Sequence, residues 1–115
     1  MKLEVGMFLR TNDGKIAKFI KYDEKDKNEL VTDYYEYSTI WIKDIIKASF
    51  NIIDLIEVGD YVNGREVVEE PCNDNFSVGQ KHLWLCNKKL YLLEQDIESI
   101  VTKEQFEQVS YKVNN

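Results

Sequence analysis

One short strand motif occurs twice in the chain, and this repeat restricts the folds that the sequence can adopt. Ile56–Val62 (IEVGDYV) matches Leu3–Leu9 (LEVGMFL) at an offset of 53 positions, and an Asp-Ile pair at 44–45 recurs at 96–97 with an offset of 52. Two matches in the same order at nearly one spacing predict two similar halves, each opening with a Glu-Val-Gly strand. Two isolated lobes of roughly 55 residues would be only marginally stable. We therefore expect them to pack on each other as one compact unit.

Turn sequences divide the first half into short strands. Asn12-Asp13-Gly14 lies between an apolar run at 6–11 and a strand-like run at 15–22, and Asp-Gly favours a tight hairpin turn because glycine reaches positive φ. The charged run 23–28 is typical of a solvated loop. Two further strands are predicted at 29–37 and 38–42, and 43–48 is expected to form a single helical turn.

The second half repeats this plan with clearer turn signals. Asn63-Gly64 predicts the corner of a hairpin over residues 61–68, and 82–86 is expected to pair with 89–93. Residues 94–99 match the earlier helical turn. Thr102 and Gln105 have the spacing of a capping box, which predicts a short helix ending near Gln108, with no counterpart in the first half.

The predicted fold class is mainly β, with two tandem SH3-like small β-barrels, short helical turns and a short C-terminal helix. The first SH3-like lobe is expected at 1–50, and the second, with the C-terminal helical turn, at 51–115. A single open β-sandwich is the alternative, because the repeat covers only the beginning and the end of each half.

The composition argues for a cytoplasmic protein and against direct nucleic-acid binding. The net charge is −6, with −1 on residues 1–56 and −5 on 57–115, and an acidic surface does not attract phosphate backbones. No apolar run is long enough to cross a bilayer, and the start of the chain lacks the apolar core of a signal peptide. Two cysteines are too few for a secreted disulfide framework, so both thiols are expected to be reduced.

Two segments carry a resemblance to a known family. Residues 47–64, which include ASFNIIDLIEVGDYVNG, and 99–107 (SIVTKEQFE) resemble a family of short phage and prophage proteins of clostridia and related Firmicutes, and the start MKLEVG also fits. The family carries no known common activity, so the resemblance assigns no functional residues. It implies a phage protein acting in the host cell cytoplasm, where small acidic proteins often block host defence. An inhibitor of the anti-CRISPR type is the first expectation and a sponge for a nucleotide immune signal is the second.

Catalytic and metal-binding chemistry find little support in the sequence. His82 and Cys86 would share one face of a strand, but residues four apart on a strand lie about 13 Å apart, too far for a direct hydrogen bond. Cys72, His82 and Cys86 lack the closely spaced cysteine pair of structural zinc sites. No Gly-rich phosphate loop is present. We therefore expect a protein that is not an enzyme, with no cofactor and no metal.

Aromatic and acidic side chains are the candidate binding residues. Tyrosine and tryptophan dominate protein interfaces, and neighbours in the cluster at 34–37 point to opposite faces of a strand, so at least one should point outward. The acidic set Glu57, Asp60, Glu66, Glu69, Glu70 and Asp74 could imitate the phosphates of a duplex. The candidate binding residues are Tyr34, Tyr35, Tyr37, Trp84, Glu66, Glu69, Glu70 and Asp74.

The sequence thus predicts a phage-derived, non-enzymatic protein that binds and blocks a host defence protein. In the first alternative, a nucleotide sponge, aromatic rings would stack on the base while Arg10, Lys18 or Arg65 converged on the phosphates. In the second, the chain is an adaptor that binds host transcription machinery or nucleic acid. Either a monomer or a homodimer is compatible with the sequence, and no membrane contact is expected.

Overall fold

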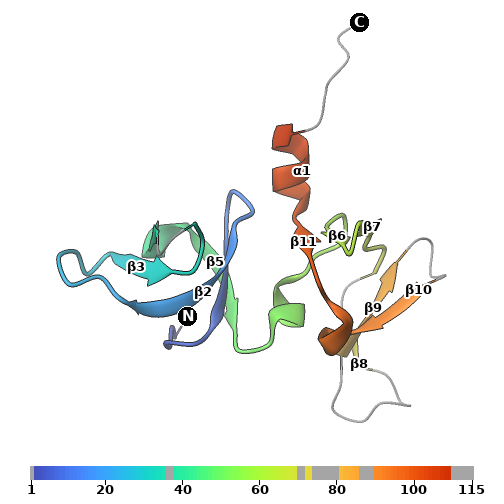
Figure 1. Cartoon of the computed structure of the whole chain (residues 1–115), viewed down its shortest axis with the longest axis horizontal. Coiled ribbons are helices and arrows are strands. Elements are labelled where there is room, and N and C mark those ends of the chain that lie inside the picture. Colours follow the sequence, from blue (N-terminus) through green and yellow to red (C-terminus); the bar gives the residue numbers. More distant parts are fainter. Residues whose placement is uncertain (1, 36–37, 70–71, 74–80, 86–89, 110–115) are drawn as a thin grey trace, which may run out of the picture. The chain divides into compact units, whose positions relative to one another are not determined.

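The computed structural model describes residues 2–35, 38–69, 72–73, 81–85 and 90–109. These residues form a mainly β structure of antiparallel strands with short 3-10 helices and a short C-terminal α-helix (Figure 1). The chain divides into two compact units, Met1–Leu55 and Ile56–Asn115. The division follows Leu55, whereas the sequence placed it after residue 50. No helix in the described part of the chain is long and apolar enough to cross a membrane.

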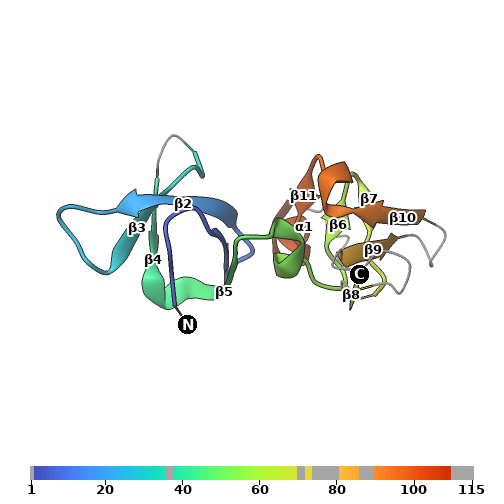
Figure 2. The same ribbon diagram turned by 90° about the horizontal axis from the view of Figure 1, so that it is seen from below.

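Unit 1 is a five-stranded antiparallel sheet in which the last strand returns beside the first. The strand order is β4-β3-β2-β1-β5, and Figures 1 and 2 show these strands from two directions. The elements are β1 (Phe8–Thr11), β2 (Ile16–Tyr22), β3 (Glu29–Thr32), β4 (Thr39–Trp41), η1 (Ile42–Asp44), β5 (Ile45–Ser49) and η2 (Ile52–Leu55), where η denotes a 3-10 helix.

The first hairpin forms as the Asp-Gly signal predicts. β1 pairs with β2, and Gly14 closes the turn with a φ of 88° and an N–H that donates to the Thr11 carbonyl at 3.1 Å. The sequence did not decide which face of β2 is buried. The pairing of β2 with β3 shifts between Phe19 and Lys21, which breaks the strict alternation of faces. Ala17 and Phe19 enter the core, whereas Lys21 is exposed.

Two predictions for the middle of unit 1 were wrong. The strand predicted at 29–37 ends at Thr32, because the Ser38 N–H donates to the carbonyls of Tyr34 and Tyr35, both at 3.2 Å, and closes a turn. The helical turn predicted at 43–48 is shorter and earlier, since only Ile42–Asp44 is helical. Residues 45–49 instead form β5, which pairs with β1.

The core of unit 1 lies on the inward face of the sheet. Its buried members come from all five strands: Leu9, Ala17, Phe19, Leu30, Ile40 and Ile45. Arg10 is also fully buried, and its Nη1 donates to the carbonyl of Leu55 at 2.8 Å. This hydrogen bond joins β1 to the end of η2, so the Arg10 side chain has a structural role inside unit 1.

Unit 2 contains two three-stranded antiparallel sheets, in the orders β10-β9-β8 and β11-β6-β7. Both predicted hairpins are confirmed, since β6 pairs with β7 around Asn63-Gly64 and β9 pairs with β10. The elements are β6 (Tyr61–Val62), β7 (Arg65–Glu66), β8 (Cys72–Asn73), β9 (Lys81–Leu85), β10 (Leu90–Leu93), η3 (Glu94–Asp96), β11 (Ile100–Val101) and α1 (Lys103–Val109).

The repeated Glu-Val-Gly segment forms the same turn in both units. Gly6 and Gly59 have φ values of 97° and 96°. The residue after each glycine donates its N–H to the carbonyl of the glutamate, from Met7 to Glu4 and from Asp60 to Glu57, both at 3.1 Å. In each unit the last strand also pairs with the first, β5 with β1 and β11 with β6. The sequence repeat therefore marks a structural repeat of the turn and of the strand pairing.

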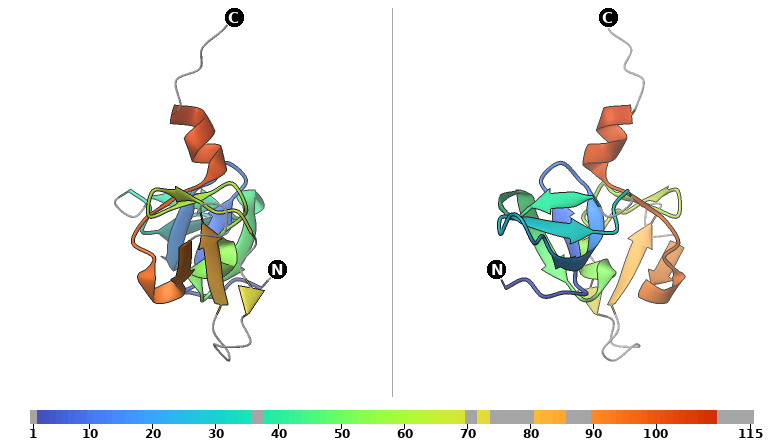
Figure 3. Two further views of the ribbon diagram at one scale, coloured as in Figure 1. Left: turned by 90° about the vertical axis from the view of Figure 1, so that its right-hand side faces the viewer. Right: turned by 60° about the vertical axis from the view of Figure 1, so that its left-hand side comes forward.

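The capping box at the C-terminal helix is confirmed. The Gln105 N–H donates to Thr102 Oγ1 at 3.3 Å, and the Thr102 N–H donates to Gln105 Oε1 at 3.2 Å. In Figures 1 and 3, the red helix α1 follows β11 after a single residue. The expectation that the first half has no counterpart was wrong, because η2 follows β5 at the corresponding place. Ser49 accepts the Asn51 N–H there at 3.0 Å.

Candidate functional site

Large apolar side chains stay exposed mainly on unit 1. Of the ten such side chains in the described residues, seven belong to this unit: Val5, Tyr22, Tyr35, Trp41, Ile42, Ile46 and Phe50. Single exposed apolar residues are normal on protein surfaces, so an arrangement matters more than a count. Two of the seven, Trp41 and Ile42, are adjacent and line one hollow.

The hollow beside Trp41, here called the Trp41 hollow, has a volume of about 350 Å³ and is lined by Asn28, Trp41, Ile42 and Lys43. It lies where the β2–β3 loop meets the start of η1, and the Ile42 N–H donates to the Asn28 carbonyl there at 2.8 Å. Trp41 is 44% exposed and Ile42 is 37% exposed. The hollow therefore offers an apolar wall that a partner could cover.

Strand register explains why Trp41 points outward. Ile40 pairs with Leu30, and both side chains are buried in the core. The next pair, Trp41 and Glu29, must then lie on the opposite face of the sheet, because successive side chains of a strand alternate. An aromatic ring on the outer face of an edge strand gains nothing from the core, which makes it a candidate contact residue.

Lys43 adds a positive charge to the Trp41 hollow. Its Nζ lies 5.4 Å from the centroid of the Trp41 ring, within the range of a cation–π contact. Lys43 is exposed, and it forms no ion pair with another described residue. Its charge is therefore available to a carboxylate that approaches along the indole ring.

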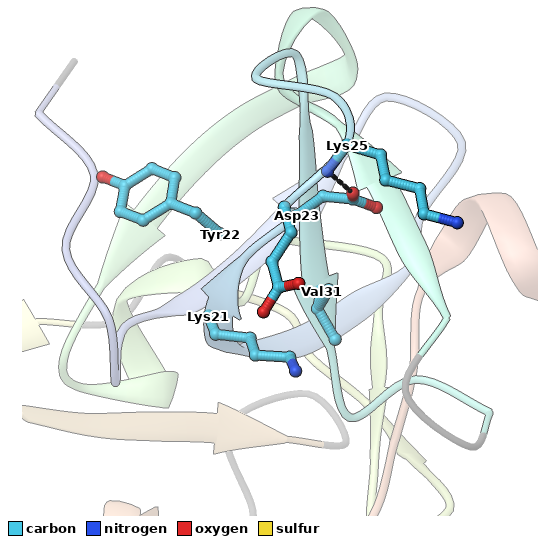
Figure 4. Close-up of a pocket in the computed structure, with 6 residues that line it drawn as sticks. Lys21, Tyr22, Asp23, Lys25 and Val31 are labelled. Atoms are coloured by element: carbon cyan, nitrogen blue, oxygen red, sulfur yellow. Dashed lines mark hydrogen bonds between the residues drawn. The ribbon is translucent and has the colours of Figure 1, made fainter.

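A second hollow, of about 270 Å³, lies where β2 passes into the β2–β3 loop and is lined by Lys21, Tyr22, Asp23, Glu24, Lys25 and Val31 (Figure 4). The Asp23 carboxylate accepts the Lys25 N–H at 2.8 Å and holds the loop in its turn. In Figure 4 the side chains of Tyr22 and Lys25 point in opposite directions. Two acidic and two basic side chains line this hollow, so it selects no ligand charge.

The predicted tyrosine cluster is only partly described. Tyr34 packs against the core of unit 1, and Tyr35 is 79% exposed, so the outward-pointing tyrosine is Tyr35. The two rings meet edge to face at 4.9 Å, and Lys15 Nζ lies 5.8 Å from the centroid of the Tyr34 ring. Tyr35 has a φ of 44°, a left-handed conformation that is strained for a bulky residue. Tyr37 lies outside the described residues.

The candidates from the second half of the sequence belong to unit 2. Glu66 is exposed in β7, opposite Tyr61, and Glu69 is half-buried. Trp84 belongs to β9 and pairs with Tyr91 through the backbone, while its side chain lies outside the described part. Glu70 and Asp74 also lie outside it.

Two of the acidic residues that were expected to imitate the phosphates of a duplex have structural roles instead. Asp60 is fully buried, and its carboxylate accepts the Glu57 N–H at 2.7 Å and the Lys103 N–H at 2.9 Å. The Glu57 carboxylate pairs with Lys103 Nζ at 2.8 Å, and this interaction raises the pKa of Lys103. Neither carboxylate is available to imitate a phosphate, because each has a partner inside unit 2.

Arg10, the first basic residue named for a nucleotide site, is not available to a ligand. Arg10 is fully buried and bonded to the Leu55 carbonyl, so it cannot reach a phosphate in solvent. Lys18 is exposed in unit 1 and Arg65 in unit 2. Arg10 therefore cannot bind a phosphate as the hypothesis of a nucleotide sponge requires.

The pairing of β8 with β9 makes a cysteine and the histidine neighbours, which the sequence did not predict. The backbone of β8 and β9 pairs Cys72 with His82, whereas the sequence argument had weighed His82 against Cys86. Only knowledge of the strand pairing could have found this neighbour. Among the described residues, no group of three or more His, Cys, Asp and Glu side chains could hold a metal ion.

None of the four residues that line the Trp41 hollow was among the candidate binding residues predicted from the sequence. The available signal was weak, because Asn28 is 13 positions from Trp41 and only the β3–β4 pairing brings the two together. No family model, curated protein or solved structure matches the chain. Function is therefore inferred from the geometry of the chain itself.

Proposed function

We propose that the chain is a non-enzymatic protein-binding protein and that the Trp41 hollow on unit 1 is its contact surface. The observation that supports this function is the pair of adjacent exposed apolar side chains, Trp41 and Ile42, around a hollow of about 350 Å³. Tryptophan is among the residues that contribute most to binding energy when a partner covers them. The exposed charge of Lys43 beside the ring gives the surface a means of selecting an acidic partner.

The proposed architecture is a tandem of two SH3-like lobes. In unit 1, the strand order β4-β3-β2-β1-β5 and the 3-10 helix before the last strand support it. In unit 2, β6, β7 and β11 pair as β1, β2 and β5 do, while β8, β9 and β10 follow the order of β2, β3 and β4. η3 precedes β11 as η1 precedes β5. A β scaffold of this kind suits a protein that works by occupying a surface.

The proposed target is a host defence protein, which the chain would block by the anti-CRISPR type of inhibition in the host cytoplasm. The resemblance of residues 47–64 and 99–107 to phage and prophage proteins supports this setting. Steric blocking requires no catalytic group, only an affinity high enough to exclude the natural ligand of the target. The roles of nucleotide sponge and transcription adaptor are weaker proposals, since no feature of the described surface favours either.

The test is an affinity capture of host proteins with the tagged full chain, run in parallel with Trp41→Ala and Tyr35→Ala. The two variants remove one exposed aromatic ring each from unit 1, so each is the control for the other. We expect the wild-type chain and Tyr35→Ala to retain one stoichiometric host protein, which mass spectrometry identifies. Trp41→Ala should lose it, with a drop in affinity of at least about tenfold for a hot-spot residue.

Two results would contradict the proposal in different ways. Loss of the host protein with Tyr35→Ala alone would move the contact surface to the β3–β4 turn. Failure of the wild-type chain to retain any host protein would refute the protein-binding function. Circular dichroism of each variant must match the wild type, because Trp41 is only half-buried and its removal should leave the core intact.

A further inference from the structure

The sheet of unit 1 ends at β4, and the backbone of this strand has an open side. In an antiparallel pair, residues alternate between hydrogen-bonded and non-hydrogen-bonded positions. The Thr32 N–H donates to the Ser38 carbonyl at 2.9 Å and the Ile42 N–H donates to the Asn28 carbonyl at 2.8 Å. Ile40 lies two residues from each of Ser38 and Ile42, so its N–H and C=O also face β3.

The residues on either side of Ile40 therefore direct their backbone groups away from β3. These groups belong to Thr39 and Trp41. The Trp41 carbonyl turns into η1, because Trp41 is the N-cap of that helix. Three outward groups remain: the Thr39 N–H, the Thr39 C=O and the Trp41 N–H. None of these groups forms a hydrogen bond with another residue of the described chain. They form a short row along the open edge of the sheet.

An extended chain is the ligand that matches this row. The amide groups of Thr39 and Trp41 are two residues apart and face the same direction, which is the spacing that a neighbouring β-strand presents. The row runs directly into the Trp41 hollow, and the exposed Lys43 lies beyond it with no carboxylate partner among the described residues. A strand along β4 would thus bring the side chains of one of its faces to an apolar hollow and to a positive charge.

We propose that β4 receives an extended segment of a partner protein as an added strand, with an apolar side chain in the Trp41 hollow and a carboxylate at Lys43. This proposal rests on the proposed function and names the chemistry of its partner. Main-chain hydrogen bonds to Thr39 and Trp41 supply part of the affinity. The hollow and Lys43 supply the preference for an apolar residue close to an acidic one.

The experiment selects a displayed library of random 12-residue peptides on the immobilised full chain. The enriched peptides are then measured against two variants at one position. Thr39→Pro removes the outward N–H, and an edge strand tolerates proline where the N–H faces solvent. Thr39→Ala retains that N–H and removes the same hydroxyl, which makes only an exposed hydrogen bond to Glu29. The enriched sequences should combine an apolar residue with a nearby Asp or Glu.

We expect Thr39→Pro to weaken binding at least about tenfold and Thr39→Ala to change it by less than about twofold. Lys43→Glu should weaken binding of the acidic peptides, and exchange of the peptide carboxylate for lysine should restore it. In the wild-type chain, hydrogen exchange at the Thr39 and Trp41 amides should slow at least tenfold when peptide binds. This last measurement tests the proposal even where the proline variant does not fold.

Enrichment of no peptide, equal binding to Thr39→Pro, or unchanged exchange at both amides would overturn strand addition. The proposed function is judged separately by the capture of a host protein. If Thr39→Pro captures that protein as well as the wild type does, strand addition fails while the binding function stands. If the wild-type chain captures no host protein, the binding function fails whatever the peptides do.

Discussion

Replacing Asp60 by alanine is predicted to destabilise unit 2 strongly. The Asp60 side chain is fully buried, and its two carboxylate oxygens accept different backbone N–H groups, from Glu57 at 2.7 Å and from Lys103 at 2.9 Å. The first bond closes the turn around Gly59, and the second fixes the first residue of α1 to that turn. Alanine removes both acceptors and leaves the two N–H groups without these partners.

The magnitude follows from the two bonds. A hydrogen bond to a charged group contributes about 1.5–3 kcal/mol, so the loss of both should cost about 3–6 kcal/mol. A unit of this length is expected to have a total stability of roughly 3–9 kcal/mol. The substitution therefore removes a large share of the free energy of unfolding of unit 2. Asp60→Asn retains one acceptor oxygen and should cost less, about 2–3 kcal/mol.

The assay is urea unfolding followed by NMR, because backbone amide signals report each unit separately. Signals from β6 and α1 should disappear at lower urea in Asp60→Ala, while signals from β1 define the response of unit 1. Glu66→Ala is the matched control, since it removes an exposed carboxylate from β7 and should change stability by less than about 0.5 kcal/mol. A loss below about 1 kcal/mol in Asp60→Ala would refute the structural role of this carboxylate.

Three further predictions test local features. Tyr35→Gly should leave the free energy of unfolding unchanged or raise it by up to about 1 kcal/mol, because glycine relieves the strain of the left-handed backbone conformation. Thermal unfolding measures this, and a decrease of more than about 1 kcal/mol would contradict the prediction. Asn63→Ala should cost about 2–3 kcal/mol, measured by urea unfolding, because the side chain makes three hydrogen bonds to the backbone of 96–99. The hydrogen bond from the Thr11 hydroxyl holds the pKa of Asp13 below its ordinary value. Asp13 therefore stabilises the fold above about pH 4, and this contribution is lost as the pH falls through the folded-state pKa of Asp13. An NMR titration should show the low pKa of Asp13, and Thr11→Val should raise that pKa.

The features that the sequence predicted correctly depend on residues close together in the chain. Asn63 and Gly64 have φ values of 51° and 80°, the two positive values that a tight hairpin turn requires. The capping box of α1 likewise involves residues three positions apart. Such signals can be read directly, because the residues that make the structure are the ones that carry the pattern.

The features that the sequence did not predict depend on contacts between distant residues. Asp60 was counted among surface carboxylates, yet its partner Lys103 is 43 positions away and draws it into the interior. The buried face of β2 depends on a register shift against β3, and no single residue in the strand signals that shift. The Trp41 hollow was missed for the same reason, since its wall combines the end of one loop with the start of η1.

The repeat bears on the proposal that the contact surface lies on unit 1. Phe50 and Lys103 are 53 positions apart, the offset of the Glu-Val-Gly repeat, and a Cβ added to Gly6 or Gly59 would lie 3.5 Å from the side chain of the respective residue. In unit 2 the side chain that lies against this glycine is Lys103, which pairs with Glu57. In unit 1 it is the aromatic ring of Phe50, which is 53% exposed. Covering an exposed ring releases free energy, but covering a partly exposed ion pair contributes little. The same turn is thus charged in unit 2 and apolar in unit 1, a difference that is consistent with the proposed contact surface on unit 1.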